Sequence, residues 1–287
     1  MKFRFISDHL ETFNVGRMCN LLNVSRSGFY AWKKRPECSR SRQNRALEDR
    51  IRLLHANSHG IYGVPRIHRD LNDAGVRCGK NRVARIMRNA GIRSRTKKKF
   101  KATTNSKHSF PVAPNLLDQK FTVDAPDRVW VGDITYIWTN EGWLYLAVVL
   151  DLYNRQVVGW AAASRINRQL AINALQAALG KREPGHGLLH HTDRGSQYAS
   201  SDYQRILKEH GMICSMSRKG NCYDNAVAES FFARLKSEWV NHNRYLSRKE
   251  AIQSLFYYIE IFYNRKRRHS FIEYATPQEY EALAIAA

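Results

Sequence analysis

The sequence lacks the features that mark membrane proteins, secreted disulfide scaffolds and zinc-finger proteins. No uncharged run reaches the roughly 18 residues that a membrane helix needs, and the N-terminus shows no signal-peptide pattern. The five cysteines are odd in number and scattered, so reduced thiols are expected rather than a disulfide framework. His55 and His59 have helical spacing, but no C-x2-4-C pair accompanies them, which argues against zinc. These absences predict a soluble protein of the cytoplasm.

Acidic residues are scarce in the front part of the chain. The 287 residues carry a formal net charge of +22, and residues 1–110 hold 26 Lys and Arg against 7 Asp and Glu, a net of +19. The remaining 177 residues hold 21 against 18, a net of +3. This division predicts a basic front part that binds a polyanion such as nucleic acid, and a nearly neutral body that performs chemistry.

The first candidate for nucleic-acid binding is the segment 13–35. Its apolar residues predict two short helices around a turn, and Ser25 can cap the second helix. Arg26 and Ser27 would then lie on the exposed first turn of that helix, as in the recognition helix of a helix-turn-helix. The residues expected to pack beneath it are Phe29, Tyr30 and Trp32.

A second helical module is predicted to follow. A helix over 40–61 precedes a helix that starts at Val64-Pro65 and another that follows Gly75, again in a helix-turn-helix pattern. The candidate phosphate or base contacts of this module are Arg66, Lys80, Asn81, Arg82 and Arg85. The predicted divisions of the whole chain are 1–38 and 39–95 for the two helical modules, 96–122 for a basic linker and 123–287 for a catalytic core.

The pattern changes to strands beyond the linker. RVWVGDITYIWT, WLYLAVVLDLYN and RQVVGWAAA are β-branched or aromatic runs separated by short breaks, which predicts antiparallel hairpins. Helices and short apolar strands then alternate, and the chain closes with a long helix over KEAIQSLFYYIEIFYNRKRRHS. This order predicts an α/β domain, a mixed sheet with helices on its faces, and it resembles the ribonuclease H-like fold.

Three acidic residues stand where a strand, a strand end and a helix would each present a carboxylate. Asp133 lies inside the first strand, Asp193 directly follows the short run LLHHT, and Glu229 lies on a later amphipathic helix. A carboxylate buried in an apolar strand is costly unless it is paired or bound to a metal. Carboxylates suit hard divalent cations, and two such ions can hold the attacking and leaving oxygens of a phosphoryl displacement. We therefore predict phosphodiester chemistry on DNA.

Helical geometry sorts the residues around Glu229. At about 100° per residue, Asn225 and Lys236 share the face of Glu229, whereas Glu238 points to the opposite side and is predicted to be a surface residue. Asn225 and Lys236 are therefore candidate DNA contacts. Lys236 is equally consistent with a phosphate-holding point charge and with a solvated helix lysine.

Two further polar residues have alternative interpretations. Asp151 ends the second predicted strand and competes with Asp133, but a strand-end aspartate is more typical of a turn. His191 shares a strand face with Asp193, and it either orients a ligand or is a packed, hydrogen-bonded histidine.

These motifs resemble those of bacterial insertion-sequence transposases of the retroviral-integrase superfamily. The spacing is similar, with 35 residues between Asp193 and Glu229, and with the basic Lys236 seven residues after Glu229. More narrowly, the chain resembles the second-frame, orfB-type product of the insertion-sequence-three family. The motifs that carry the resemblance are GDITYI, HTDRGSQY, DNAVAESFFARLKSE, YNRKRRHS followed by YATP, MCNLLNVSRSGFYAWKKR and YGVPRIHRDL.

The resemblance implies a DDE transposase. Asp133, Asp193 and Glu229 would hold Mg²⁺, with Mn²⁺ as a substitute, for 3′-end cleavage and strand transfer. The implied partners are the element ends, target DNA and further copies of the chain on DNA, in the bacterial nucleoid. The family's end-binding module with its zipper usually comes from a first-frame protein, which is an expected partner or fusion because this chain shows no heptad run. The alternatives are an inert DNA-binding regulator and a nuclease of the same fold.

Overall fold

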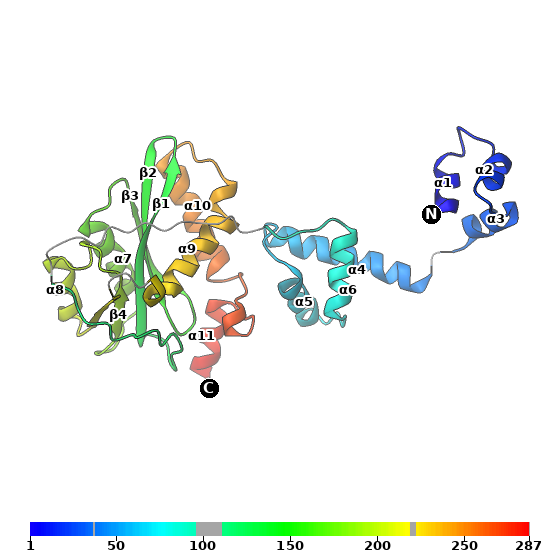
Figure 1. Ribbon diagram of the computed structural model, residues 1–287. Coiled ribbons are helices and arrows are strands. Elements are labelled where there is room, and N and C mark those ends of the chain that lie inside the picture. The colour runs from blue at the N-terminus through cyan, green and yellow to red at the C-terminus, as the bar shows by residue number, and fades with distance from the viewer. Residues whose placement is uncertain (37, 96–110, 219–221, 287) are drawn as a thin grey trace.

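The computed structural model describes residues 1–36, 38–95, 111–218 and 222–286. Figure 1 shows three parts in chain order: a small helical module, a second helical module, and a larger domain built around a β-sheet. No helix in these ranges is both long enough and apolar enough to cross a bilayer. The arrangement is a ribonuclease H-like mixed-sheet core preceded by small all-helical modules, as the sequence predicts.

The first module consists of three short helices, α1 (Lys2–Asp8), α2 (Val15–Leu21) and α3 (Arg26–Lys34). Ser25 caps α3 as predicted, because its hydroxyl accepts a hydrogen bond of 3.0 Å from the amide of Gly28. The module has a core of its own, formed by Ile6, Met18, Cys19 and Phe29. Tyr30 and Trp32 are 45% and 38% exposed, so the prediction that they pack beneath the helix is wrong. Helix α1 was not predicted.

The second module contains α4 (Ser39–Asn57), α5 (Val64–Asp73) and α6 (Lys80–Asn89). Pro65 lies in the first turn of α5, where its missing amide proton costs no hydrogen bond. The buried face of this helical trio consists of Leu47, Ile51, Ile67, Leu71, Val83, Ile86 and Met87. These residues belong to the same hydrophobic cluster as one face of the sheet domain, so the second module and the sheet domain share a continuous core.

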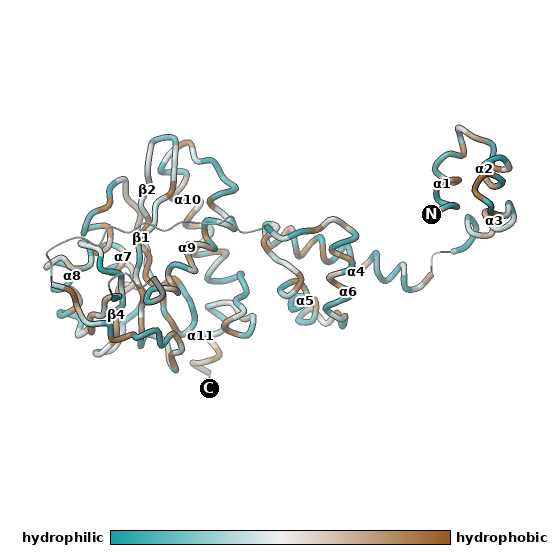
Figure 2. Tube along the Cα trace, in the orientation of Figure 1, coloured by the Kyte–Doolittle hydropathy of each residue, from teal (hydrophilic) through white to brown (hydrophobic). Residues whose placement is uncertain are grey.

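Five strands form the sheet in the order β3-β2-β1-β4-β5. The hairpin strands β1 (Val129–Thr139), β2 (Gly142–Asp151) and β3 (Val157–Ala163) pair antiparallel, as predicted. The short strands β4 (Leu189–Thr192) and β5 (Ile213–Met216) pair parallel to β1 and to each other. Figure 2 shows hydrophobic stretches along the strands in the middle of this domain.

Helices cover both faces of the sheet. On one face, α7 (Arg168–Lys181) and α8 (Ser201–Glu209) bury the cluster that contains Trp130, Ala147 and Val149. On the other face, α9 (Ala226–Glu238) and α10 (Arg248–Phe256) pack over the alternate residues, such as Val131 and Val148. This alternation of burial along each strand is the period-two pattern that predicted the strands.

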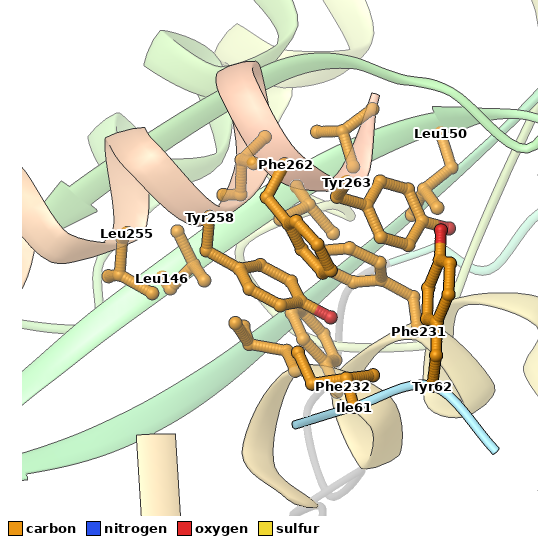
Figure 3. Packing of buried hydrophobic residues seen from close by; sticks show 14 of the residues in the cluster. Ile61, Tyr62, Leu146, Leu150, Phe231, Phe232, Leu255, Tyr258, Phe262 and Tyr263 are labelled. Carbon is orange, nitrogen blue, oxygen red and sulfur yellow. The ribbon is translucent and has the colours of Figure 1, made fainter. Parts of the chain in front are cut away.

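The C-terminal part is more broken than predicted. Instead of one long helix, α10 continues into a π-helical segment, Tyr257–Tyr263, and the chain then turns before α11 (Pro277–Ala286). Single 3₁₀ turns lie at Cys222–Asn225, Val240–His242 and Ser270–Ile272. The aromatic residues of the π-helical segment pack into the core beside α9, as Figure 3 shows for Tyr258, Phe262 and Tyr263.

Candidate active site

Asp133 and Asp193 lie side by side on neighbouring strands. Gly132 of β1 is the register partner of Thr192, the last residue of the parallel strand β4, and the two aspartates are the next residues along each strand. Because β4 ends there, no strand among the described residues pairs with β1 on that side beyond Gly132. Asp133 accepts a hydrogen bond of 2.8 Å from the amide of Ile134, and Asp193 accepts one of 2.9 Å from Gly195.

Electrostatics couple these acids to Glu229. Burial raises the pKa of Asp133 well above its usual value, and the nearby carboxylates of Asp193 and Glu229 raise it further. Partial burial and the charge of Asp193 also raise the pKa of Glu229, which lies at the more exposed rim. Three carboxylates that disfavour each other's ionisation form a site that a cation would stabilise.

Helix α9 brings Glu229 to this edge. Glu229 is in the first turn of α9, and the helix contacts β1. Asn225, the residue before the helix, is 5% exposed and donates a hydrogen bond of 3.2 Å from Nδ2 to the carbonyl of Gly132. This bond ties the start of α9 to the backbone directly before Asp133. Asn225 is therefore a positioning residue in this structure. Its side chain is buried, and the DNA contact predicted for it stays a prediction.

Lys236 lies on the same side of α9 as Glu229. Its ammonium is 4.5 Å from the ring centroid of Tyr136 on β1, and the side chain is 8% exposed, so it is not a solvated lysine. Burial lowers the pKa of Lys236 to about 8, and the carboxylate of Asp133 partly opposes that shift. A buried ammonium beside the aspartates would be a point charge for an anionic ligand.

Tyr198, which no sequence pattern singles out, lies near enough to Asp133 and Asp193 for their charges to act on it. Its hydroxyl is buried and has no hydrogen-bond partner within the described ranges. Burial raises the pKa of Tyr198 well above its usual value, and the charges of Tyr203, Asp133 and Asp193 add to the effect. The only signal in the sequence is the position of Tyr198, five residues after Asp193 in the motif HTDRGSQY.

His191 and Asp151 have structural roles. His191 bonds through Nδ1 to the hydroxyl of Ser215 (2.8 Å) and through Nε2 to that of Ser217 (3.2 Å), and burial lowers its pKa to about 4. It is thus the packed, hydrogen-bonded histidine of the two interpretations. Asp151 accepts hydrogen bonds of 2.8 Å from the amides of Asp127 and Tyr153, as expected of a turn residue.

Arg66 contacts other side chains of the protein, and the DNA contact predicted for it stays a prediction. Its guanidinium lies 5.4 Å from the ring centroid of Tyr62 and 4.0 Å from the carboxylate of Glu238, and burial lowers its pKa to about 10. Glu238 is not the surface residue that its helix position predicts, because its carboxylate pairs with the fully buried Arg267. The sequence shows only that these residues are charged. Charged residues occur both at interfaces between modules and on DNA-binding surfaces.

The other candidate DNA contacts face solvent to different degrees. Arg82 is half-buried and donates a hydrogen bond of 2.9 Å to Asn44 of α4. The residues with exposed side chains are Arg26, Ser27, Lys80, Asn81 and Arg85.

Models of known protein families match most of the chain. An integrase core domain matches residues 123–222, and a second model with the same description matches residues 210–277. An HTH-like domain matches residues 42–100. These ranges coincide with the sheet domain and with the α4–α6 module.

Curated relatives match over nearly the full length. The chain is 43% identical over 288 residues to the transposase InsF of insertion sequence IS3A from Escherichia coli K12, with both chains fully covered. It is 47% identical over 253 residues to an uncharacterised 31 kDa protein of insertion element IS600 from Shigella sonnei, covering 88% of this chain and 93% of that one. A chain of the simian T-cell lymphotropic virus intasome, solved with PP2A regulatory subunit B56 gamma, is 18% identical, with a TM-score of 0.47 and coverage of 80% and 74%.

Proposed function

This chain belongs to the IS3 family of insertion-sequence transposases, and from that premise we propose that it cleaves the 3′ ends of its element and joins them to target DNA. The observation that carries the proposal is the pair Asp133 and Asp193, adjacent on parallel strands, with Glu229 electrostatically coupled to them from α9. Phosphodiester cleavage and joining both need an oxygen nucleophile and a stabilised leaving oxygen, and three carboxylates at one edge suit that task.

The chemistry of the donor set fits divalent metal ions, Mg²⁺ with Mn²⁺ as a substitute. Asp133, Asp193 and Glu229 would hold them, and when bound the ions activate the attacking oxygen and stabilise the leaving oxygen. Within the described ranges, no three His, Cys, Asp or Glu side chains are grouped closely enough to hold one ion together.

The neighbouring groups have separate tasks in this proposal. Lys236 binds the phosphate beside Asp133 through its buried ammonium. Tyr198 offers its buried hydroxyl as a donor on the side of the two aspartates. Asn225 keeps the first turn of α9 against Gly132, so that Glu229 stays near the strand edge.

DNA is the proposed partner of the basic front part. Lys80, Asn81 and Arg85 are exposed on α6, at the end where a helix-turn-helix presents its second helix to a groove. Both ends of an element have to be joined to one target, so we propose that copies of the chain act together on DNA. A first-frame protein of the element is the proposed fusion or binding partner for recognition of the ends.

Strand transfer is the experiment that tests this proposal. The full chain, with and without the first-frame protein, is mixed with labelled element-end DNA, a target plasmid and Mg²⁺ or Mn²⁺. We expect joined product from the wild type and a loss of about 10³-fold or more in Asp133→Asn and Glu229→Gln, because removal of a charged metal ligand removes most of the stabilisation of the transferring phosphate.

Glu209→Gln is the matched control, because Glu209 is an exposed acid on α8 that pairs with Arg205 away from the site. It should retain wild-type activity. Cleavage without joining would indicate a nuclease instead. DNA binding without either reaction, even with the first-frame protein present, would indicate an inert regulator.

A further inference from the structure

The second helical module inserts a tyrosine into the sheet domain. Ile61 and Tyr62, in the loop before α5, are each 4% exposed and pack among Phe231, Phe232 and other core side chains (Figure 3). The Tyr62 hydroxyl donates a hydrogen bond of 2.8 Å to the carbonyl of Lys266 and accepts one of 2.8 Å from the amide of Arg268. A buried phenol that is satisfied on both sides fixes the position of the loop that carries it.

Arg268 extends this contact onto helix α5. Its guanidinium forms an ion pair with Asp70 and a second one of 2.7 Å with Asp73, and it donates a hydrogen bond of 2.8 Å to the carbonyl of Tyr274. The Arg268 and Asp70 side chains are each 17% exposed. Partly buried charge pairs with several bonds per guanidinium are stronger and more directional than surface pairs.

The same module holds the far end of the helix that carries Glu229. Arg95 donates a hydrogen bond of 2.8 Å to the carbonyl of Glu238, the last residue of α9, and the Arg66 guanidinium lies 4.0 Å from the Glu238 carboxylate. Arg267 donates hydrogen bonds of 2.7 and 2.5 Å to that carboxylate. An α-helix is stiff, and Glu229 lies nine residues earlier, about 13 Å away at 1.5 Å per residue. A shift at Glu238 is therefore transmitted to Glu229.

We propose that the α4–α6 module is a positioning part of the catalytic unit: docked through Tyr62 and Arg268, it sets the orientation of α9 and hence of Glu229. The exposed residues of α6 belong to the same rigid module, so DNA bound there lies at a fixed distance from the acids. Docking then determines which phosphodiester is cut. This inference rests on the proposed cleavage activity and assigns a role to the motif YNRKRRHS, which the cleavage chemistry does not use.

The test breaks the docking pair in the full chain. Asp70→Asn and Arg268→Gln are compared with the reversed pair Asp70→Arg with Arg268→Asp, and with Asp49→Asn, an exposed acid of α4 in the same module. Three quantities are measured: hydrogen exchange of the α9 amides without DNA, affinity for element-end DNA, and cleavage mapped to single nucleotides with the first-frame protein present.

We expect the two single variants to speed exchange in α9 and to bind the ends within about threefold of wild type. Cleavage at the correct phosphodiester should fall about 10- to 100-fold, with cuts appearing at neighbouring positions, because a shift of about 1 Å at a reacting centre costs about that much. The reversed pair should recover only part of the precision, because its new aspartate faces Asp73 as well as the new arginine, and Asp49→Asn should match wild type.

Unchanged hydrogen exchange of the α9 amides would overturn the inference. A loss of cleavage that matches the loss of end binding, with the cuts still at the correct phosphodiester, would also overturn it. Wild-type protein that never cleaves would instead count against the proposed function. In that case the exchange comparison still decides whether docking positions α9.

Discussion

Burying the charged side chain of Lys236 costs free energy of folding, so its burial points to a role other than stabilising the fold. Its ammonium lies over the ring of Tyr136, and burial lowers its pKa to about 8 from an ordinary value near 10.5. The unfolded chain therefore binds more protons than the folded chain between about pH 8 and pH 10.5, so this group's contribution to stability rises with pH in that window. At neutral pH the buried charge destabilises the fold.

We predict that Lys236→Met stabilises the protein at pH 7 by about 1–2 kcal/mol and lowers strand transfer. Urea unfolding at pH 7 and at pH 9.5 measures the first effect, and the difference from wild type should shrink at the higher pH. Lys249→Met is the control, because Lys249 is exposed on α10 and should show no such difference. A variant less stable than wild type at pH 7 would contradict the prediction.

The buried hydroxyl of Tyr198 is a neutral group whose burial also costs stability. Its buried hydroxyl has no partner within the described ranges, whereas that of Tyr203 lies 2.7 Å from His190 Nε2. We predict that Tyr198→Phe raises the free energy of unfolding by about 1 kcal/mol and that Tyr203→Phe lowers it by about 1–3 kcal/mol. Thermal unfolding of both variants measures these changes, and equal shifts of the same sign would show that the Tyr198 hydroxyl is satisfied. Cleavage assays then show whether Tyr198 serves the reaction.

The close approach of α7 to β3 depends on one glycine. A Cβ on Gly159 would overlap the carbonyl oxygen of Ala174 and would lie 2.5 Å from the amide nitrogen and 2.7 Å from the Cβ of Ala178. Since two of these three atoms are backbone, no side-chain rotation relieves the clash, and the helix has to move away from the sheet.

We predict that Gly159→Ala destabilises the sheet domain by about 3 kcal/mol or more, with a large fall in Tm. Gly180, in the last turns of α7, offers the matched control, because nothing lies within 4 Å of a Cβ added there. Gly180→Ala should stabilise by about 0.5–1 kcal/mol, since alanine loses less backbone freedom in a helix. Similar Tm values for the two variants would refute the proposed close packing.

The strands and most helices could be predicted because their signals are local. Period-two burial in β1 and β2 and apolar spacing in α5 and α6 are both present in short windows of sequence. Helix α1 and the π-helical segment at Tyr257–Tyr263 could not be predicted in this way. The first has one fully buried residue, Ile6, and the second departs from helical spacing because its aromatic rings pack into a core that the sequence does not reveal.

The candidate site likewise divides into residues with local sequence signals and residues whose contacts lie far apart in the sequence. Asp133, Asp193 and Glu229 were selected from strand, strand-end and helix patterns, and the structure brings them to one edge, although their catalytic role remains a prediction. The contacts of Arg66 and Glu238 lie outside short windows of sequence, because Arg66 pairs with Glu238 about 170 positions away and Glu238 pairs with Arg267, 29 positions away. Formal charge cannot distinguish a guanidinium that faces DNA from one that faces another module.

The charge of the whole molecule is divided between its parts, with a net of +19 in residues 1–110 and +3 in the rest. Some of that positive charge is already used within the protein, since Arg66 and Arg95 contact Glu238. The DNA-binding charge is therefore smaller than the formal charge, and it is concentrated on exposed helix faces such as that of α6.

The salt dependence of DNA affinity measures how many of these positive charges contact DNA phosphates. We predict that affinity for DNA falls steeply between low and physiological salt, because each neutralised phosphate releases counterions and adds about −0.9 to the slope of log K against log salt concentration. If Lys80 and Arg85 each contact one phosphate, the double variant Lys80→Ala with Arg85→Ala should reduce the steepness by about 2. Lys208→Ala, an exposed lysine of α8 on the nearly neutral body, should leave the slope unchanged.

A flat profile for the wild type would mean that the basic front part does not bind the phosphate backbone. An unchanged slope in the double variant would move the contact from α6 to another exposed face, with α3 and its Arg26 the next to test.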